Sequence, residues 1–285
     1  MANPPVLDRE EYVEQAYLFR TVRERLGDNL PVQDILLAAH DELLTTTRLP
    51  MAVQFLVTEL KHSGLLGNGF GKLPHYFTAF QAFVVTQAET AGRKFDMATA
   101  FLVLEREAAY KAAAVSPAGL FVYQLETITR NRLGYGPGFD AMAADPHYDP
   151  VWVDFVAFAK RQMGVLDLGQ LVYLRSELYV ADVRRSERDY EPPVPPVFGV
   201  KEGRIGKASR GREPVYLFAA LQRQLGYPEV PKPNQRDDLK TKLDVINAKL
   251  KELEQRLRLA EGEIRGNVDL SQFGKPDISK PDDDE

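Results

Sequence analysis

Only one pair of residues in the sequence has the types and spacing of a metal site. Glu59 and His62 are three residues apart, so on a helix both would project from one face, as ligands do in di-iron bundles. Such a centre needs a second Glu-x-x-His pair, and none of the other three histidines has a glutamate three positions before it. His62 precedes Gly64, where an imidazole suits the negative end of a helix. We predict no metal, no cofactor and no catalytic residue.

The glycine-rich stretch 64–71 resembles a phosphate-binding loop only superficially. Its glycines lack the spacing of the P-loop, and Lys72 is followed by leucine where that motif has serine or threonine. It also follows a helical pattern, whereas a dinucleotide-binding turn follows a strand. The sequence favours a flexible loop between helices. His75 and Tyr76 come just after it and could line a pocket there.

Residues 201–212 form the most basic part of the chain. Five lysines and arginines stand there against one glutamate, so the segment could contact anions. It has no interleaved aromatic residues for base stacking, and the whole chain has a net charge of −5, so nucleic-acid binding is not favoured. The candidate anion contacts are Arg204, Lys207, Arg210 and Arg212.

The elements that carry these residues are predicted to be helices throughout. Apolar residues from 8 to 187 recur every three or four positions and are interrupted at glycine or proline, with no alternation typical of strands. Asp8 and Glu11 resemble a capping box at the first helix. We therefore predict an all-α fold, a bundle of about eight helices within residues 1–190. The expected helices are 8–26, 32–47, 50–61, 74–91, 97–114, 117–133, 150–163 and 168–187.

The composition changes at residue 191. A run rich in proline opens a linker over residues 191–235, and prolines of this density favour an extended spacer. Within the linker, residues 214–225 predict a short amphipathic helix. Its apolar stripe must be buried on its own bundle, on a sister subunit or in a partner's groove. The stripe consists of Leu217, Phe218, Leu221 and Leu225.

Residues 236–266 have the pattern of a coiled coil. Apolar residues follow each other in alternating steps of four and three for about four heptads, which keeps one seam facing a partner helix. We expect a homo-oligomer, with a parallel dimer favoured by the flanking charges. Residues 267–285 are predicted to be a disordered acidic tail. The oligomerisation residues are Leu239, Leu243, Ile246, Leu250, Leu253, Leu257 and Ile264.

The absence of cysteine, of a signal-peptide pattern and of a long apolar stretch indicates where in the cell the protein is expected. The chain of 285 residues has no cysteine, so it has neither a disulfide framework nor a cysteine nucleophile. The sequence starts without a signal-peptide pattern, and no stretch has the roughly 18 apolar residues of a membrane helix. We expect a cytoplasmic protein that does not enter a membrane.

These patterns favour a non-enzymatic scaffold or adapter that self-associates through its coiled coil and binds another protein, as yet unidentified. Two alternatives stay open. One is an enzyme or small-ligand-binding protein with a pocket near residues 64–71. The other is weak association with nucleic acid through residues 201–212.

Overall fold

The computed structural model describes residues 6–28, 30–90, 92, 94–113, 115–232, 249–251 and 253. The chain divides into two units, Met1–Pro233 and Asn234–Glu285. Thirteen α-helices and no β-strand occur in the described ranges, which confirms the all-α prediction. None of the helices among these residues combines the length and the apolar character needed to cross a membrane. The helices are α1 Arg9–Leu26, α2 Val32–His40, α3 Leu49–Ser63, α4 Leu66–Lys72, α5 Ala79–Glu89, α6 Met97–Ala112, α7 Pro117–Arg130, α8 Tyr135–Ala143, α9 Pro150–Gln162, α10 Leu168–Leu174, α11 Glu177–Arg184, α12 Val200–Ala208 and α13 Pro214–Leu225.

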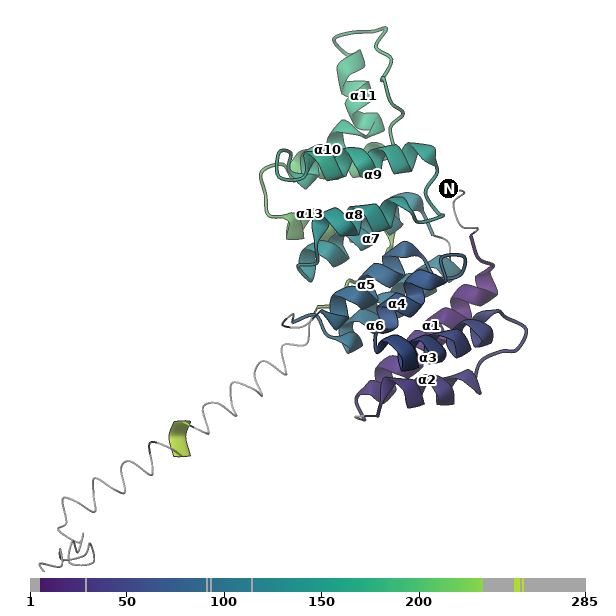
Figure 1. The fold of residues 1–285 in the computed structure, drawn as a ribbon. Helices are drawn as coiled ribbons and strands as arrows, with labels where there is room; N and C mark the ends of the chain where they lie inside the picture. Colours follow the sequence, from purple (N-terminus) through teal and green to yellow (C-terminus); the bar gives the residue numbers. More distant parts are fainter. Residues whose placement is uncertain are drawn as a thin grey trace, which may run out of the picture. The chain divides into compact units, whose positions relative to one another are not determined.

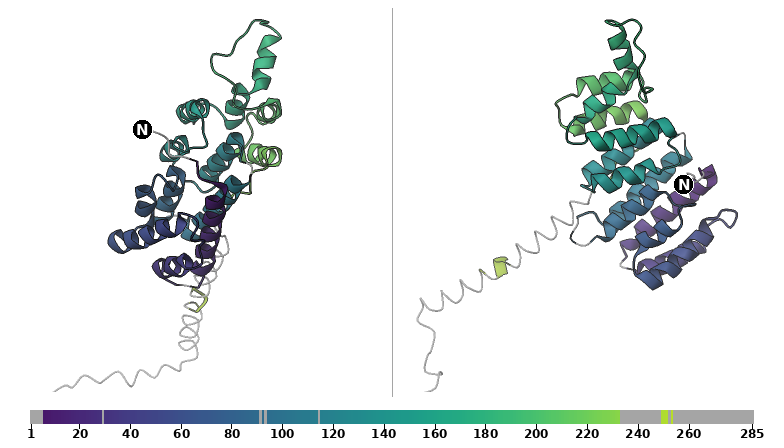
Figure 2. Two further views of the ribbon diagram at one scale, coloured as in Figure 1. Left: turned by 90° about the vertical axis from the view of Figure 1, so that its right-hand side faces the viewer. Right: turned by 45° about the horizontal axis from the view of Figure 1, so that its top comes forward.

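The helices of the first unit are stacked along its length (Figures 1 and 2). α1 packs mainly on α6, while α2, α3, α4 and α5 follow each other as neighbours. α5 reaches α8, which packs on α7 and α9. α10 lies against α12, and α13 returns to α7. The stack runs from α2 at one end to α11 at the other (Figure 1).

Local capping explains where several helices begin. The carboxylates of Asp96, Asp149 and Asp167 each accept a hydrogen bond from the backbone N–H three residues later, which satisfies a donor that the helix leaves free. The capping box predicted at Asp8 is wrong, because the Asp8 side chain accepts no such bond. The carboxylate of Glu11 instead accepts hydrogen bonds from the Arg48 backbone and the Tyr76 hydroxyl.

The prediction of a loop over the glycine-rich residues 64–71 is wrong for most of that stretch. Residues 66–72 form α4, because its glycines allow neighbouring helices to come close. A Cβ on Gly67 would lie 2.4 Å from Thr86 Oγ1, and one on Gly69 would lie 2.8 Å from Leu56 Cδ2. Residues 134–149, which lie between the expected helices 117–133 and 150–163, likewise contain a helix, α8.

Residues 200–208, expected within the linker, form α12 and pack on α10. Gly203 and Gly206 lie close to the segment 169–178 of the same chain. A Cβ on Gly206 would lie 2.7 Å from the Gly169 carbonyl oxygen. α13 has the bounds predicted from its apolar stripe. The side chains of this stripe lie in the core of the first unit, with Leu217, Phe218 and Leu221 buried and Leu225 partly buried against the core.

Aromatic side chains fill much of this core. Phe77 and Phe80 are buried, and Trp152 and Phe155 form a second buried group with their ring centroids 5.6 Å apart. Phe198, which follows the proline-rich run, joins the second group with its ring centroid 5.4 Å from those of Trp152 and Phe155. That burial fixes the end of the proline-rich segment next to α11.

Candidate functional site

A proline-rich strap, residues 190–198, lies beside α11 and encloses space against it. At one end the backbone N–H groups of Val197 and Phe198 donate to the Arg175 carbonyl, at 2.9 and 3.1 Å. At the other end the Nε of Arg184 donates to the Tyr190 carbonyl at 3.0 Å. The strap is therefore held at both ends, and its prolines restrict the backbone between.

α11 begins because Ser176 interrupts the predicted helix 168–187. The Ser176 hydroxyl donates to the Tyr173 carbonyl and accepts from the Tyr179 N–H, which caps the new helix. None of the eight residues of α11 is buried. The helix projects at the end of the stack (Figure 1), and its packing partners are α12, α10 and the strap.

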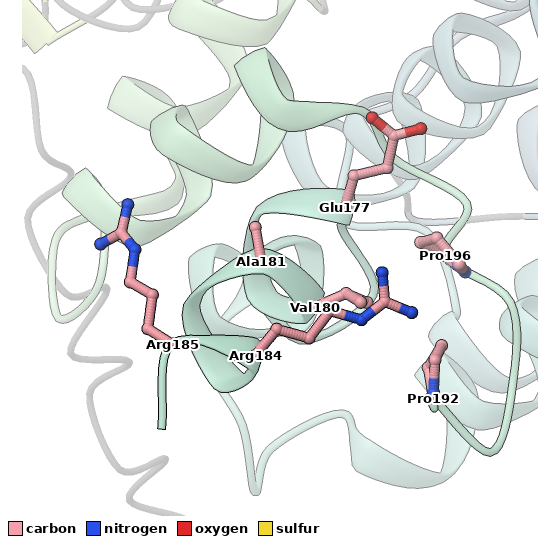
Figure 3. A pocket seen from close by; sticks show the side chains of 7 residues that line it. All are labelled: Glu177, Val180, Ala181, Arg184, Arg185, Pro192 and Pro196. Carbon is pink, nitrogen blue, oxygen red and sulfur yellow. The ribbon is translucent and has the colours of Figure 1, made fainter. Parts of the chain in front are cut away.

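An outer cavity of about 660 Å³ lies between α11 and the strap (Figure 3). Arg184 extends toward the prolines, and Arg185 turns to the other side of the helix (Figure 3). Arg185 is 79% exposed and forms an ion pair of 3.3 Å with Asp182. The lining residues are Glu177, Val180, Ala181, Arg184, Arg185, Pro192 and Pro196.

An inner cavity of about 280 Å³ shares Val180, Pro192 and Pro196 with the outer one. Its other walls are mostly aromatic and apolar, and one of them carries Arg175. We call the two cavities together the strap groove. The further lining residues of the inner cavity are Phe158, Leu174, Ser176, Tyr179, Tyr190, Pro193 and Val194.

Arg175 is the charged group of the inner cavity. Its guanidinium carbon lies 5.4 Å from the ring centroid of Phe155 and 5.9 Å from that of Phe158. Its Nη2 donates to the Pro195 carbonyl at 3.3 Å. Burial lowers the pKa of Arg175, and the negative charge of Asp154 opposes that shift. The arginine is thus held by ring faces and one carbonyl, and no carboxylate of the described residues forms an ion pair with it.

The structure brings together two of the four predicted anion contacts. Lys207 and Arg210 both lie over the Tyr173 ring, at 5.3 and 4.0 Å from its centroid. Lys207 also pairs with Asp182 at 2.7 Å. Hydrogen bonds from Lys207 and Tyr173 lower the pKa of Asp182, so this carboxylate already neutralises part of the charge.

Arg204 and Arg212 are exposed and have no ion pair among the described residues. They do not join the Tyr173 cluster.

His75 and Tyr76 do not share a pocket. Tyr76 is buried, and its hydroxyl donates to Glu11 at 2.7 Å, whereas His75 is exposed. Burial and the neighbouring Glu11 carboxylate raise the pKa of Tyr76. Residues 66–72, which precede His75 and Tyr76, form α4 where a loop was expected.

A buried charged cluster lies where α6 and α7 meet the turn after α8. Lys111 contacts Asp145 at 2.8 Å and Glu107 at 3.3 Å, and all three side chains are fully buried. Gln124 donates to Glu107 at 2.7 Å, and Tyr148 donates to Gln124 at 2.8 Å. The sequence predicts Glu107 and Lys111 only as a helix-supporting pair, since Asp145 lies far from them along the chain.

The cluster shows strong electrostatic coupling. Burial raises the pKa of Glu107 and works to raise that of Asp145 too, but the charges of Lys111 and His147 lower the pKa of Asp145 overall. The two carboxylates raise the pKa of Lys111 against its own burial. No group of three or more metal-ligating side chains is found in the described part of the chain. We interpret the cluster as structural.

The predicted coiled coil falls almost entirely outside the described residues. Leu250 and Leu253 are described; both are helical and exposed, at 52% and 59%. The other predicted oligomerisation residues, Leu239, Leu243, Ile246, Leu257 and Ile264, lie outside the described ranges.

No protein-family model matches the sequence, and no curated protein or solved structure is detectably similar to it.

Proposed function

We propose that this protein is a non-enzymatic adapter that binds a segment of a partner protein in the strap groove. The observation that carries the proposal is α11, a helix with no buried residue beside an open cavity of about 660 Å³. Contiguous exposed apolar surface marks interaction sites. The partly exposed Val180 and the exposed Ala181 line the groove together with Pro192 and Pro196.

The groove suits a polypeptide segment. A helix forms one wall and an extended strap the other, and the prolines of the strap have no N–H groups to leave unsatisfied when water is displaced. The strap is anchored at both ends, so binding orders little additional chain. The inner cavity provides a recess for an anchoring side chain.

The charges around the groove favour an acidic and apolar partner segment. Arg175, Arg184 and Arg185 line the two cavities, against a single acid, Glu177. Of the three arginines, only Arg185 forms an ion pair with a carboxylate among the described residues. Acidic groups on a partner would therefore find unneutralised arginine donors.

The adapter also self-associates through residues 236–266 on this proposal, and it acts in the cytoplasm. A seam of leucine and isoleucine every three to four residues is costly to leave in water unless a second helix covers it. A dimer would present two strap grooves, which raises the avidity for a partner with repeated segments.

The groove is tested by selecting displayed 12-residue peptides on the full-length protein. Val180→Glu places a charge between the two cavities, and Val165→Glu is its control, since Val165 is 75% exposed outside the groove. We expect selected peptides to bind the wild type and the control but not Val180→Glu. Peptides that bind all three proteins equally, or no enrichment, would overturn the groove as the binding site.

Self-association is tested by light-scattering mass on the full-length chain and on a chain ending at Asn234. We expect an oligomer, most simply a dimer, that becomes a monomer on truncation. Full-length protein with both Leu250 and Leu253 changed to Lys should also be monomeric, because lysines in the seam cost more than the helix pairing returns. A monomeric wild type, or an oligomer that survives truncation, would contradict this part of the proposal.

A further inference from the structure

Arg175 is partly buried, and it stands apart because the protein itself accepts so few of its N–H hydrogen bonds. A guanidinium has five N–H donors. Among the described residues only one acceptor serves Arg175, the Pro195 carbonyl at 3.3 Å. Its Nε is buried and has no hydrogen-bond partner in the described part of the chain.

Such an arrangement is costly for the free protein. A buried polar group without a partner keeps its desolvation penalty, and the penalty is larger for a charged group. The lowered pKa of Arg175 has the same cause, since burial disfavours its charged form. The rings of Phe155 and Phe158 stabilise the cation through their faces but offer no acceptor for its N–H groups.

The position of Arg175 allows a ligand to supply the missing hydrogen-bond acceptor. It lines the inner cavity together with Tyr179 and Tyr190, so an acceptor entering that cavity would meet the guanidinium between aromatic and proline walls. A carboxylate is the acceptor whose two oxygens match two N–H groups of a guanidinium.

We propose that Arg175 is the receptor for a carboxylate carried by the bound peptide, an aspartate, a glutamate or a C-terminal carboxyl next to an apolar or aromatic group. This inference rests on the proposed peptide-binding function and specifies the chemical group that the strap groove recognises.

The surroundings favour a carboxylate over a phosphate. Phosphate sites usually gather several cationic and backbone donors around a charge near −2. The inner cavity has one cation, and the negative charge of Asp154 acts on it. A single negative charge on an apolar body fits this cavity better than a dianion.

The first test uses small probes that need no peptide. Binding of 3-phenylpropionate, its amide and phenyl phosphate to the full-length protein is followed by NMR line broadening of each probe. We expect the carboxylate to bind about tenfold or more tightly than the amide, and more tightly than the phosphate. Equal binding of acid and amide, or tighter binding of the phosphate, would overturn the assignment.

Variants then locate the carboxylate. Arg175→Gln keeps a polar side chain but removes the charge, and Arg161→Gln is its control on the exposed end of α9, outside both cavities. We expect Arg175→Gln to bind acid and amide probes equally, while Arg161→Gln keeps the wild-type preference. Thermal unfolding of both variants shows whether each is folded. An acid preference that persists in folded Arg175→Gln would refute the role of Arg175.

The same substitutions separate this inference from the peptide-binding proposal. If selected peptides depend on Val180 yet bind equally when each acidic group is replaced by its amide, the groove stands and the carboxylate receptor fails. If the acid probe depends on Arg175 but no peptide depends on Val180, the receptor stands as a small-ligand site and the adapter proposal fails.

Discussion

Replacing Lys111 by Met should be among the most destabilising single changes in the first unit. The side chain keeps its length and its packing but loses the ammonium that neutralises two buried carboxylates, Asp145 at 2.8 Å and Glu107 at 3.3 Å. Burial already holds the pKa of Glu107 above its ordinary value, so Asp145 is the charge left uncompensated. Gln124 and His147 remain as its hydrogen-bond partners.

Removing one partner of a buried ion pair typically costs about 3–5 kcal/mol. For a unit of this size that corresponds to a fall in melting temperature of about 6–20 °C. The control is Lys160→Met, the same substitution in a pair with Asp140 at the surface, where both side chains are substantially exposed. An exposed pair contributes about 1 kcal/mol or less.

The assay is thermal and urea unfolding followed by circular dichroism, on the single variants Lys111→Met, Asp145→Asn and Lys160→Met and on the double variant Lys111→Met with Asp145→Asn. We expect the double variant to regain part of the stability that Lys111→Met loses, because the unpaired charge is gone. A loss in Lys111→Met no larger than in Lys160→Met would refute the reasoning. A double variant less stable than the sum of its single changes would do the same.

Four further substitutions, one of them a control, are tested in unfolding experiments. Burial raises the pKa of Glu107 above its ordinary 4.5, so ionisation of this carboxyl destabilises the fold as the pH rises past 4.5. Glu107→Gln should therefore gain stability relative to the wild type between pH 4.5 and neutrality. A stability difference that does not change with pH would contradict this. Gly206→Ala should cost about 1–3 kcal/mol because its Cβ would lie 2.7 Å from a backbone carbonyl of α10. Gly71→Ala, with nothing within 4 Å of its Cβ, should instead be neutral or stabilising, and equal losses would refute the packing argument. Tyr227→Phe removes a buried hydroxyl that donates to Glu126 at 2.7 Å and should cost about 1.5–3 kcal/mol; an unchanged midpoint would show that this bond contributes nothing.

Features that depend on neighbouring residues are predictable from the sequence. The caps at Asp96, Asp149 and Asp167 follow from a side chain and an N–H three positions away, and the structure has all three. Asp8 shows the limit of this reasoning. Its expected partner Glu11 is used instead by Arg48 and Tyr76, which lie 37 and 65 residues away. A distant interaction that offers two donors outweighs the local one.

Glycine-rich stretches mislead sequence-based prediction for a related reason. Glycine weakens an isolated helix, so the composition of residues 64–71 and 201–212 favours a loop and a linker. In the structure three of these glycines, Gly67, Gly69 and Gly206, lie where a backbone or side-chain atom would come within 3 Å of an added Cβ. Close packing of the helices compensates for the weak propensity, and no local pattern reveals which neighbour will be there.

Only part of the strap groove could be predicted from the sequence. The density of prolines after residue 190 predicts an extended segment, and residues 191–197 contain no helix. The return of this segment to α11 depends on the hydrogen bonds of Val197 and Phe198 to Arg175, and on the burial of Phe198 among distant aromatic rings. These are tertiary contacts, so the cavities that they create could not be predicted.

Lys111 and Arg175 show how a structural cation can be separated from one that recognises a ligand. Lys111 is fully buried and has two carboxylates within ion-pair distance, so its charge is compensated before any ligand arrives. Arg175 is partly buried and contacts one carbonyl and two ring faces, and its buried Nε has no hydrogen-bond partner among the described residues. Burying a charge without compensation disfavours folding, so selection for stability alone would replace Arg175 by an uncharged residue. Its placement in an accessible cavity beside the strap supplies the reason to keep it: the missing acceptor comes with the partner.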